Sequence, residues 1–151
     1  MRLVLAIAIL VLVCGCASAP EKKMFTSSDF DNLRFLEGRW IGKAPDGSAF
    51  YEEYRFVAAG KLRSDRHADA TFSSSNESST VVLHDGRVTS TWNDFTWIAS
   101  ALVPGKACFV PVNAPSSFCW ERASENEVHV IQRWKDEHGA QQEYVVVLLR
   151  A

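Results

Sequence analysis

The sequence lacks the features that mark most enzymes, nucleic-acid-binding proteins and transmembrane domains. After Val13, no apolar run approaches the roughly 20 residues that a membrane-spanning helix needs. The net charge is −2, and no basic tract is longer than Glu21-Lys22-Lys23, which argues against nucleic acid as a partner. The sequence has no G-x-S-x-G, no glycine-rich phosphate loop and no metal-ligand spacing, and its four histidines (67, 84, 129 and 138) are scattered. We therefore expect no catalytic residues, no bound metal and no cofactor.

The first sixteen residues, MRLVLAIAILVLVCGC, have the pattern of an export signal. Arg2 gives a short positive start, and residues 3–13 are uninterrupted apolar side chains. The run ends in Val13-Cys14-Gly15-Cys16, which resembles the bacterial lipobox, although Cys14 stands where the lipobox prefers alanine or serine. The resemblance implies cleavage before Cys16 and acylation of that cysteine by fatty acids such as palmitate. Ala17-Ser18-Ala19 offers an ordinary secretory cleavage site as the alternative.

The chain is therefore expected to have three parts. These are a lipoprotein signal peptide over residues 1–15, a lipidated tether over 16–27 and one folded domain over 28–151. Ala17, rather than aspartate, follows the cysteine, and the lipoprotein resemblance then implies the outer membrane. We expect a monomer in the bacterial cell envelope, lipid-anchored and facing the periplasm.

Two cysteines remain once the signal is removed and Cys16 is acylated. Cys108 and Cys119 lie on segments that look like neighbouring antiparallel strands, and an exported domain meets an oxidising compartment. This placement predicts a disulfide between them. Two buried free thiols, packed as small hydrophobic side chains, are the alternative.

The sequence of the folded domain predicts a structure that is almost entirely β-strand. A short helix with Ser28 as its N-cap and an apolar face of Phe30, Leu33 and Leu36 is expected first. Turn dipeptides then divide the chain into about ten strands, expected at 39–44, 49–57, 61–72, 79–84, 87–92, 95–103, 106–112, 117–122, 127–135 and 141–150. Strands in this meander order predict an up-and-down antiparallel barrel, with a β-sandwich as the alternative.

Turn chemistry also predicts which residues face the interior. Two-residue turns at Asp85-Gly86 and Asn93-Asp94 give one apolar face of Val81, Leu83, Val88, Ser90, Trp92, Phe95, Trp97, Ala99 and Ala101. A three-residue turn at 58–60 pairs Val57 with Lys61 and, further along, sets Glu52 opposite Arg66 on the inward side. A one-residue slip, or a wet position at the barrel end, is the alternative for this charged pair.

The segment Leu33-Arg34-Phe35-Leu36-Glu37-Gly38-Arg39-Trp40-Ile41-Gly42 resembles the calycin superfamily of lipocalins and fatty-acid-binding proteins. The following Phe50-Tyr51-Glu52-Glu53 is closer to nitrobindin-like barrels. The resemblance implies that Gly38 permits a tight passage from helix to strand, and that Trp40 closes the barrel floor with Arg150 stacked on it. Nitrobindins bind haem through a histidine of the final strand, and residues 141–150 contain none, so haem is not expected.

These observations predict a barrel that binds a small, partly apolar ligand in its interior. Glu52 and Arg66 would be its polar contacts, and its aromatic lining would be Tyr54, Phe56, Trp92, Phe95, Trp97 and Trp134. Glu52 and Glu53 are adjacent on one strand and point to opposite faces, which argues against a catalytic carboxylate pair. The alternative is an envelope interaction or structural protein with a solid barrel and no small ligand.

Overall fold

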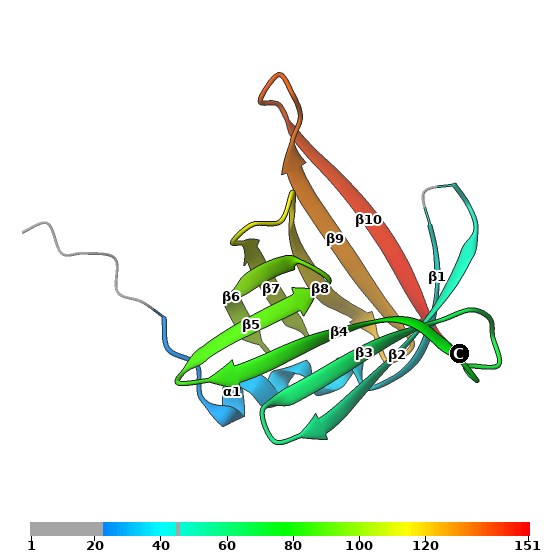
Figure 1. Ribbon diagram of the computed structural model, residues 1–151, viewed down its shortest axis with the longest axis horizontal. Coiled ribbons are helices and arrows are strands. Elements are labelled where there is room, and N and C mark those ends of the chain that lie inside the picture. Colours follow the sequence, from blue (N-terminus) through cyan, green and yellow to red (C-terminus); the bar gives the residue numbers. More distant parts are fainter. Residues whose placement is uncertain (1–22, 45) are drawn as a thin grey trace, which may run out of the picture.

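The computed structural model describes residues 23–44 and 46–151. The predicted signal peptide and Cys16 lie outside these residues. The described chain forms a short helical segment followed by a closed antiparallel barrel (Figure 1). In this part of the chain, no helix is long and apolar enough to cross a bilayer.

Ten strands form the barrel, and each is hydrogen-bonded to its neighbours in the sequence. Their bounds are β1 Gly38–Lys43, β2 Ala49–Ala58, β3 Lys61–His67, β4 Ser75–His84, β5 Arg87–Trp92, β6 Phe95–Val103, β7 Lys106–Pro111, β8 Ser117–Ser124, β9 Glu127–Lys135 and β10 Gln141–Arg150. The first and last strands close the barrel by pairing Trp40 with Arg150 and Ile41 with Leu149. The predicted up-and-down barrel is confirmed, and the sandwich alternative is wrong.

The helical segment consists of α1 (Ser27–Asp31) and the 3₁₀ helix η1 (Asn32–Leu36). The expected N-cap, Ser28, is wrong because Thr26 occupies that position. The Thr26 hydroxyl accepts the backbone N–H of Asp29, and the Asp29 carboxylate accepts the backbone N–H of Thr26 at 2.7 Å, so two otherwise unpaired donors are satisfied together. Phe25 is also buried in the core, so the folded domain includes residues that were assigned to the tether.

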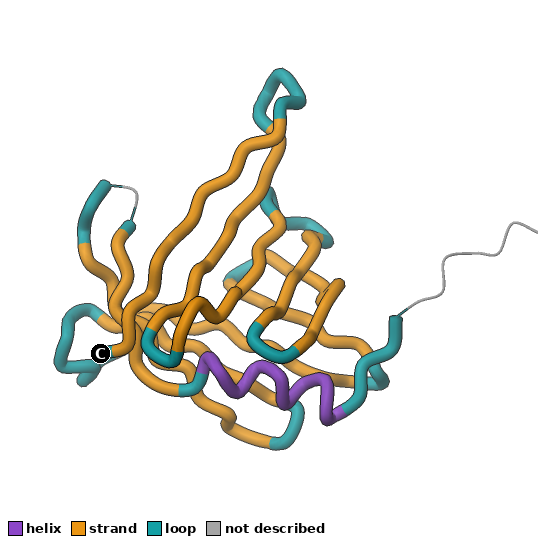
Figure 2. Tube along the Cα trace, turned by 180° about the vertical axis from the view of Figure 1, so that it is seen from behind, coloured by secondary structure: helices purple, strands orange, loops and turns teal. Residues whose placement is uncertain are grey.

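The helical segment closes one end of the barrel. Phe30, Leu33 and Leu36 are almost completely buried, and η1 packs against β6 and β7. Figure 2 shows the helices lying across the strands at the end opposite the long β9–β10 hairpin. This face is apolar at a helical spacing and cannot be left in water, so it fills the barrel end as a plug.

Trp40 joins this plug to the barrel. Its indole Nε1–H donates to the Leu36 carbonyl at 2.7 Å, and the Arg150 guanidinium lies 4.3 Å from the centre of its ring. Arg150 also donates to the carbonyls of Glu37 and Glu125. Gly38 has a φ of +125°, and an added Cβ would collide with the Arg150 guanidinium. These contacts confirm the expected arrangement of Gly38, Trp40 and Arg150.

The β3–β4 connection differs from the predicted strands. β3 ends at His67 instead of residue 72, and β4 begins at Ser75 instead of residue 79. A bulge interrupts the pairing at His67, and Phe72, with a φ of +54°, turns back and is buried against the outside of the barrel. The serine-rich stretch forms the first part of β4, and its residues Glu77, Ser78 and Ser79 line the barrel interior.

A second bulge corrects one residue of the predicted apolar face. The pairing of β6 with β7 shifts between Ala99 and Ala101, so Leu102, at 3% exposure, is the next buried residue of the core, and Ala101 is not. The turn at 58–60 likewise carries a bulge, which pairs Ala58 instead of Val57 with Lys61. Beyond that bulge, the predicted register holds.

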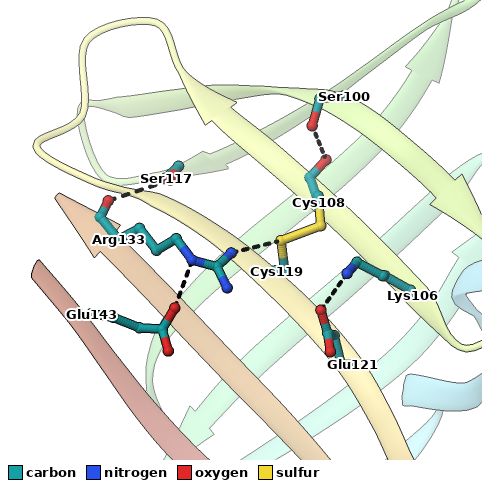
Figure 3. Close-up of a disulfide and its surroundings, with 8 residues drawn as sticks. All are labelled: Ser100, Lys106, Cys108, Ser117, Cys119, Glu121, Arg133 and Glu143. Carbon is teal, nitrogen blue, oxygen red and sulfur yellow. Dashed lines mark hydrogen bonds and ion pairs between the residues drawn. A yellow bond between two sulfur atoms is a disulfide. The ribbon is translucent and has the colours of Figure 1, made fainter. Parts of the chain in front are cut away.

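The cysteines are bonded across two neighbouring strands. Cys108 of β7 pairs directly with Cys119 of β8, and their sulfur atoms are at disulfide-bonding distance. Figure 3 shows the bridge beside two ion pairs, Lys106 with Glu121 and Arg133 with Glu143. The predicted disulfide is confirmed, and the alternative of two free thiols is wrong.

A candidate ligand cavity in the barrel

The barrel is packed at its plugged end and hollow at the other. The core side chains of the plugged half are nearly all below 8% exposure. The other half encloses a cavity of about 430 Å³, within the size range of small-molecule sites. Its lining comes from eight of the ten strands and from the β7–β8 loop, and it includes Phe50, Glu52, Tyr54, Ser64, Arg66, Glu77, Ser79, Ser90, Trp92, Phe95, Trp97, Pro115, Ser116, Phe118, Trp120, Val130, Gln132 and Val146.

One side of the cavity is a continuous series of aromatic rings, which we call the aromatic wall: Trp92, Phe95, Trp97, Phe118 and Trp120. Consecutive ring centres in this series are 4.9 to 6.2 Å apart. These spacings and the tilted or edge-to-face angles suit aromatic pairs. The Trp97 indole N–H donates to the Ser116 carbonyl at 2.7 Å, which ties the β7–β8 loop to this wall.

The opposite side carries a polar network on β2 and β3. Glu52 lies opposite Arg66, as the turn predicted, and the Arg66 Nη2 donates to the Glu52 Oε1 at 2.8 Å. The Tyr54 hydroxyl donates to the other oxygen, Oε2, at 2.6 Å. Burial, followed by the negative charge of Glu52, raises the pKa of Tyr54 well above its ordinary value, so Tyr54 stays a neutral donor. Both carboxylate oxygens of Glu52 therefore already accept a hydrogen bond.

This network lies toward the open end. The side chain of Glu52 is 14% exposed and that of Arg66 is 44% exposed. The Arg66 guanidinium is 4.8 Å from the Phe50 ring centre, and its cross-strand neighbour on β4 is Glu77. The pair thus faces inward and also reaches water, a position between the two alternatives that the sequence left open.

Of the predicted ligand contacts, five line one cavity: Glu52, Tyr54, Arg66, Trp92 and Trp97. Phe95 lines it as well. Phe56 does not, because it packs against Phe30 of α1 at the plugged end. Trp134 lies 36% exposed beside a shallow surface groove near the β9–β10 hairpin and is absent from the cavity lining.

The sequence analysis missed Phe118 and Trp120 as cavity residues, although a signal for them was present. Once Cys108 and Cys119 are paired on the outer face of β7 and β8, strand alternation sends both neighbours of Cys119 inward. Of the serines of the lining, Ser90 belongs to the inward face that the turns predict, whereas Ser64 and Ser79 carry no such signal, because serine is equally common on wet surfaces.

The outer face of β2 and β3 holds a second group of charges, well separated from the cavity. Asp65 lies on this outer face, yet it is only 2% exposed, because it pairs with Arg55 at 2.7 Å and Arg63 at 2.8 Å. Burial raises the pKa of Asp65, and the hydrogen bonds and charges of the two arginines outweigh this and hold it below its ordinary value. This group stabilises the β2–β3 pair.

Glu52 and Glu53 point to opposite faces, as expected. Glu53 lies outside the barrel, where its Oε1 accepts from the Arg39 Nε at 2.9 Å. Among the residues that the structure describes, no three His, Cys, Asp or Glu side chains gather in a group able to hold a metal ion.

The comparisons with known proteins show the fold alone. No protein-family model and no curated protein matches the chain. A crystal structure of a protein of unknown function of the DUF3598 family from Nostoc punctiforme PCC 73102 is similar at a TM-score of 0.51 and 16% identity, over 89% of this chain and 53% of that one. The chain thus spans about half the length of that protein.

Two further structures have lower similarity. The structure named EF1p2_mFAP2b bound to DFHBI has a TM-score of 0.41 at 11% identity, over 81% of this chain and 98% of that one. A redesigned β-barrel, b11L5F_LGL, has a TM-score of 0.35 at 12% identity, over 80% and 95% of the two chains. The fold that this protein shares with the DUF3598 structure is a β-barrel.

Proposed function

We propose that this protein is a lipid-anchored envelope protein that binds a small, partly apolar molecule inside its barrel. The observation that supports this most is the cavity of about 430 Å³, which combines an aromatic wall with the Tyr54–Glu52–Arg66 network. Small-molecule sites have this character, a mostly apolar lining with a few converging polar groups that fix the ligand's orientation.

The cavity favours this proposal over a solid interaction barrel. A small barrel can be filled completely by large inward side chains, and the plugged half of this barrel is filled in that way. In the other half, Ser64, Ser79 and Ser90 stand where larger residues would meet the aromatic wall. Three small polar side chains on adjacent strands leave the volume that a ligand needs.

The envelope location rests on the sequence. Gly15-Cys16 follows directly on the apolar run, and this lipobox resemblance implies a lipid anchor. The bond between Cys108 and Cys119 is in keeping with an oxidising compartment such as the periplasm. The calycin resemblance of residues 33–42 adds a fold in which interior ligand binding is common.

Native mass spectrometry of the chain purified from its own membranes tests the proposal, because a bound small molecule adds a discrete mass. Ser79→Phe should fill the cavity and abolish this mass. Thr80→Phe, on the outer face of the same strand, is the matched control and should keep it. A bound mass that survives Ser79→Phe, or no bound mass in any preparation, would contradict an interior ligand site.

A further inference from the structure

The ionisable side chains of the cavity have an uneven balance of charge. Its lining includes two carboxylates, Glu52 and Glu77, and one guanidinium, Arg66, a formal charge of −1. Among the residues that the structure describes, no lysine and no histidine lines the cavity. A ligand that enters therefore meets net negative charge, in surroundings where the low dielectric of the barrel wall strengthens electrostatic interactions.

Arg66 is not free to bind an anionic ligand, because it is already paired with Glu52. Its Nη2 donates to the Glu52 Oε1 at 2.8 Å, and its guanidinium lies against the Phe50 ring. An incoming carboxylate would have to share Arg66 with Glu52 and would approach Glu77, the cross-strand neighbour of Arg66. Like charges brought together at an interface cost binding energy, so an anionic ligand is disfavoured.

Glu77 and the aromatic wall instead favour a cationic ligand. Glu77 is exposed at the cavity mouth, and no ion pair joins it to another residue within 23–44 or 46–151. An ammonium group could pair with it without displacing a protein cation. The rings of the wall, three of them tryptophans, also attract cations through their electron-rich faces.

Building on the proposed function, we propose that the ligand is a cationic aromatic molecule of the arylalkylamine class. Its ring lies against the aromatic wall and its ammonium group lies near Glu77. The serine hydroxyls and Gln132 on the cavity lining are available to further polar groups of the ligand.

Three probes that share a naphthalene ring and differ in the charge of the attached group test whether the cavity binds the ring at all and whether it prefers a cation. Isothermal titration calorimetry would use 2-naphthylmethylammonium, neutral 2-naphthalenemethanol and anionic 2-naphthoate, with the full chain in nanodiscs and empty nanodiscs as the reference. We expect the ammonium probe to bind about tenfold more tightly than the alcohol, with the carboxylate weakest. Equal affinities, or a preference for naphthoate, would overturn this inference and leave the proposed function standing. Binding of none of the three would refute the aromatic site, and this inference with it.

Charge-removing variants then locate the preference. Glu77→Gln should weaken the ammonium probe about threefold to tenfold and leave the alcohol unchanged, since only the cation interacts with this carboxylate. Glu125→Gln makes the same change in net charge at the β8–β9 turn of the plugged end and should change neither affinity. If the two variants weaken the ammonium probe equally, the preference comes from overall charge and the assignment to Glu77 is wrong.

Discussion

Removing each member of the Glu52–Arg66 pair should reveal how far the pair is buried, and the two removals should differ in cost. Glu52→Ala leaves the hydroxyl of Tyr54, a side chain only 3% exposed, without its acceptor, which costs about 1–3 kcal/mol. Arg66, at 44% exposure, regains water and adds less than about 1 kcal/mol. We expect Glu52→Ala to lower the free energy of unfolding by about 2 kcal/mol.

Arg66→Ala should cost less. The Glu52 carboxylate keeps the Tyr54 hydroxyl as a donor, and the ion pair is half-exposed on the Arg66 side, so its loss is worth at most about 1 kcal/mol. Loss of the contact with the Phe50 ring adds about 0.5 kcal/mol. The expected total is about 1 kcal/mol, roughly half the cost of Glu52→Ala.

Urea unfolding followed by tryptophan fluorescence measures both costs, and a double-mutant cycle isolates the coupling between the two side chains. The coupling should be below about 1 kcal/mol, as for a half-exposed pair. A cost of about 3–5 kcal/mol for Arg66→Ala would mean that Glu52 is left as an uncompensated buried charge. That result would refute the wet cavity mouth on which the ranking rests.

Three further predictions concern the disulfide, the acid stability and the anchor. Cys108→Ser should lower the free energy of unfolding by about 3 kcal/mol, because the chain-entropy model gives roughly this value for a loop whose ends are 11 residues apart. A loss below about 1 kcal/mol would show that the disulfide hardly restricts the unfolded chain. The lowered pKa of Asp65 means that its ionised form stabilises the fold at neutral pH and that this stability is lost as the pH falls below about 4. The urea midpoint of Asp65→Asn should therefore fall less than that of the wild type between about pH 5 and pH 2. The same fall in both proteins would show that the acid sensitivity does not come from Asp65. Cys16→Ser should abolish acyl labelling and release the chain from the membrane fraction, whereas persistent labelling and membrane association would contradict a lipid on Cys16.

The hairpins at Asp85-Gly86 and Asn93-Asp94 could be predicted because their chemistry is local. Asp85 and Asn93 have φ values of +48° and +49°, a conformation that aspartate and asparagine tolerate better than most residues. Once the turn is fixed, strand alternation decides which residues face inward. The register of β4, β5 and β6, and with it three of the five rings of the aromatic wall, follows from these few residues.

The features that the sequence did not reveal depend on distant parts of the chain. Phe72 is a hydrophobic residue in a strand-like context, and its turn back is favoured by a ring contact with Tyr51 of another strand, 5.9 Å away. The bulge before Ala101 has no marker such as glycine. Trp134 lies on an apolar parity, but its strand runs past the end of the cavity, and only the tilt of the strands reveals this. The residue pattern therefore predicts well which side chains face the barrel interior, but it predicts poorly how far along the barrel axis each of them lies.

The plug also decides how the barrel is presented to its surroundings. The N-terminal segment of the described residues lies beside the β4–β5 turn, where the Phe25 N–H donates to the Gly86 carbonyl at 2.7 Å. β10 also ends at the plugged base, where the Arg150 N–H donates to the Asn126 carbonyl at 3.0 Å. Whatever is attached ahead of Lys23 therefore joins the barrel at its sealed base. If an N-terminal lipid holds the protein, the cavity mouth, at the opposite end, is free to turn away from the bilayer. The proposed ligand would then enter and leave the barrel on the side that faces away from the membrane.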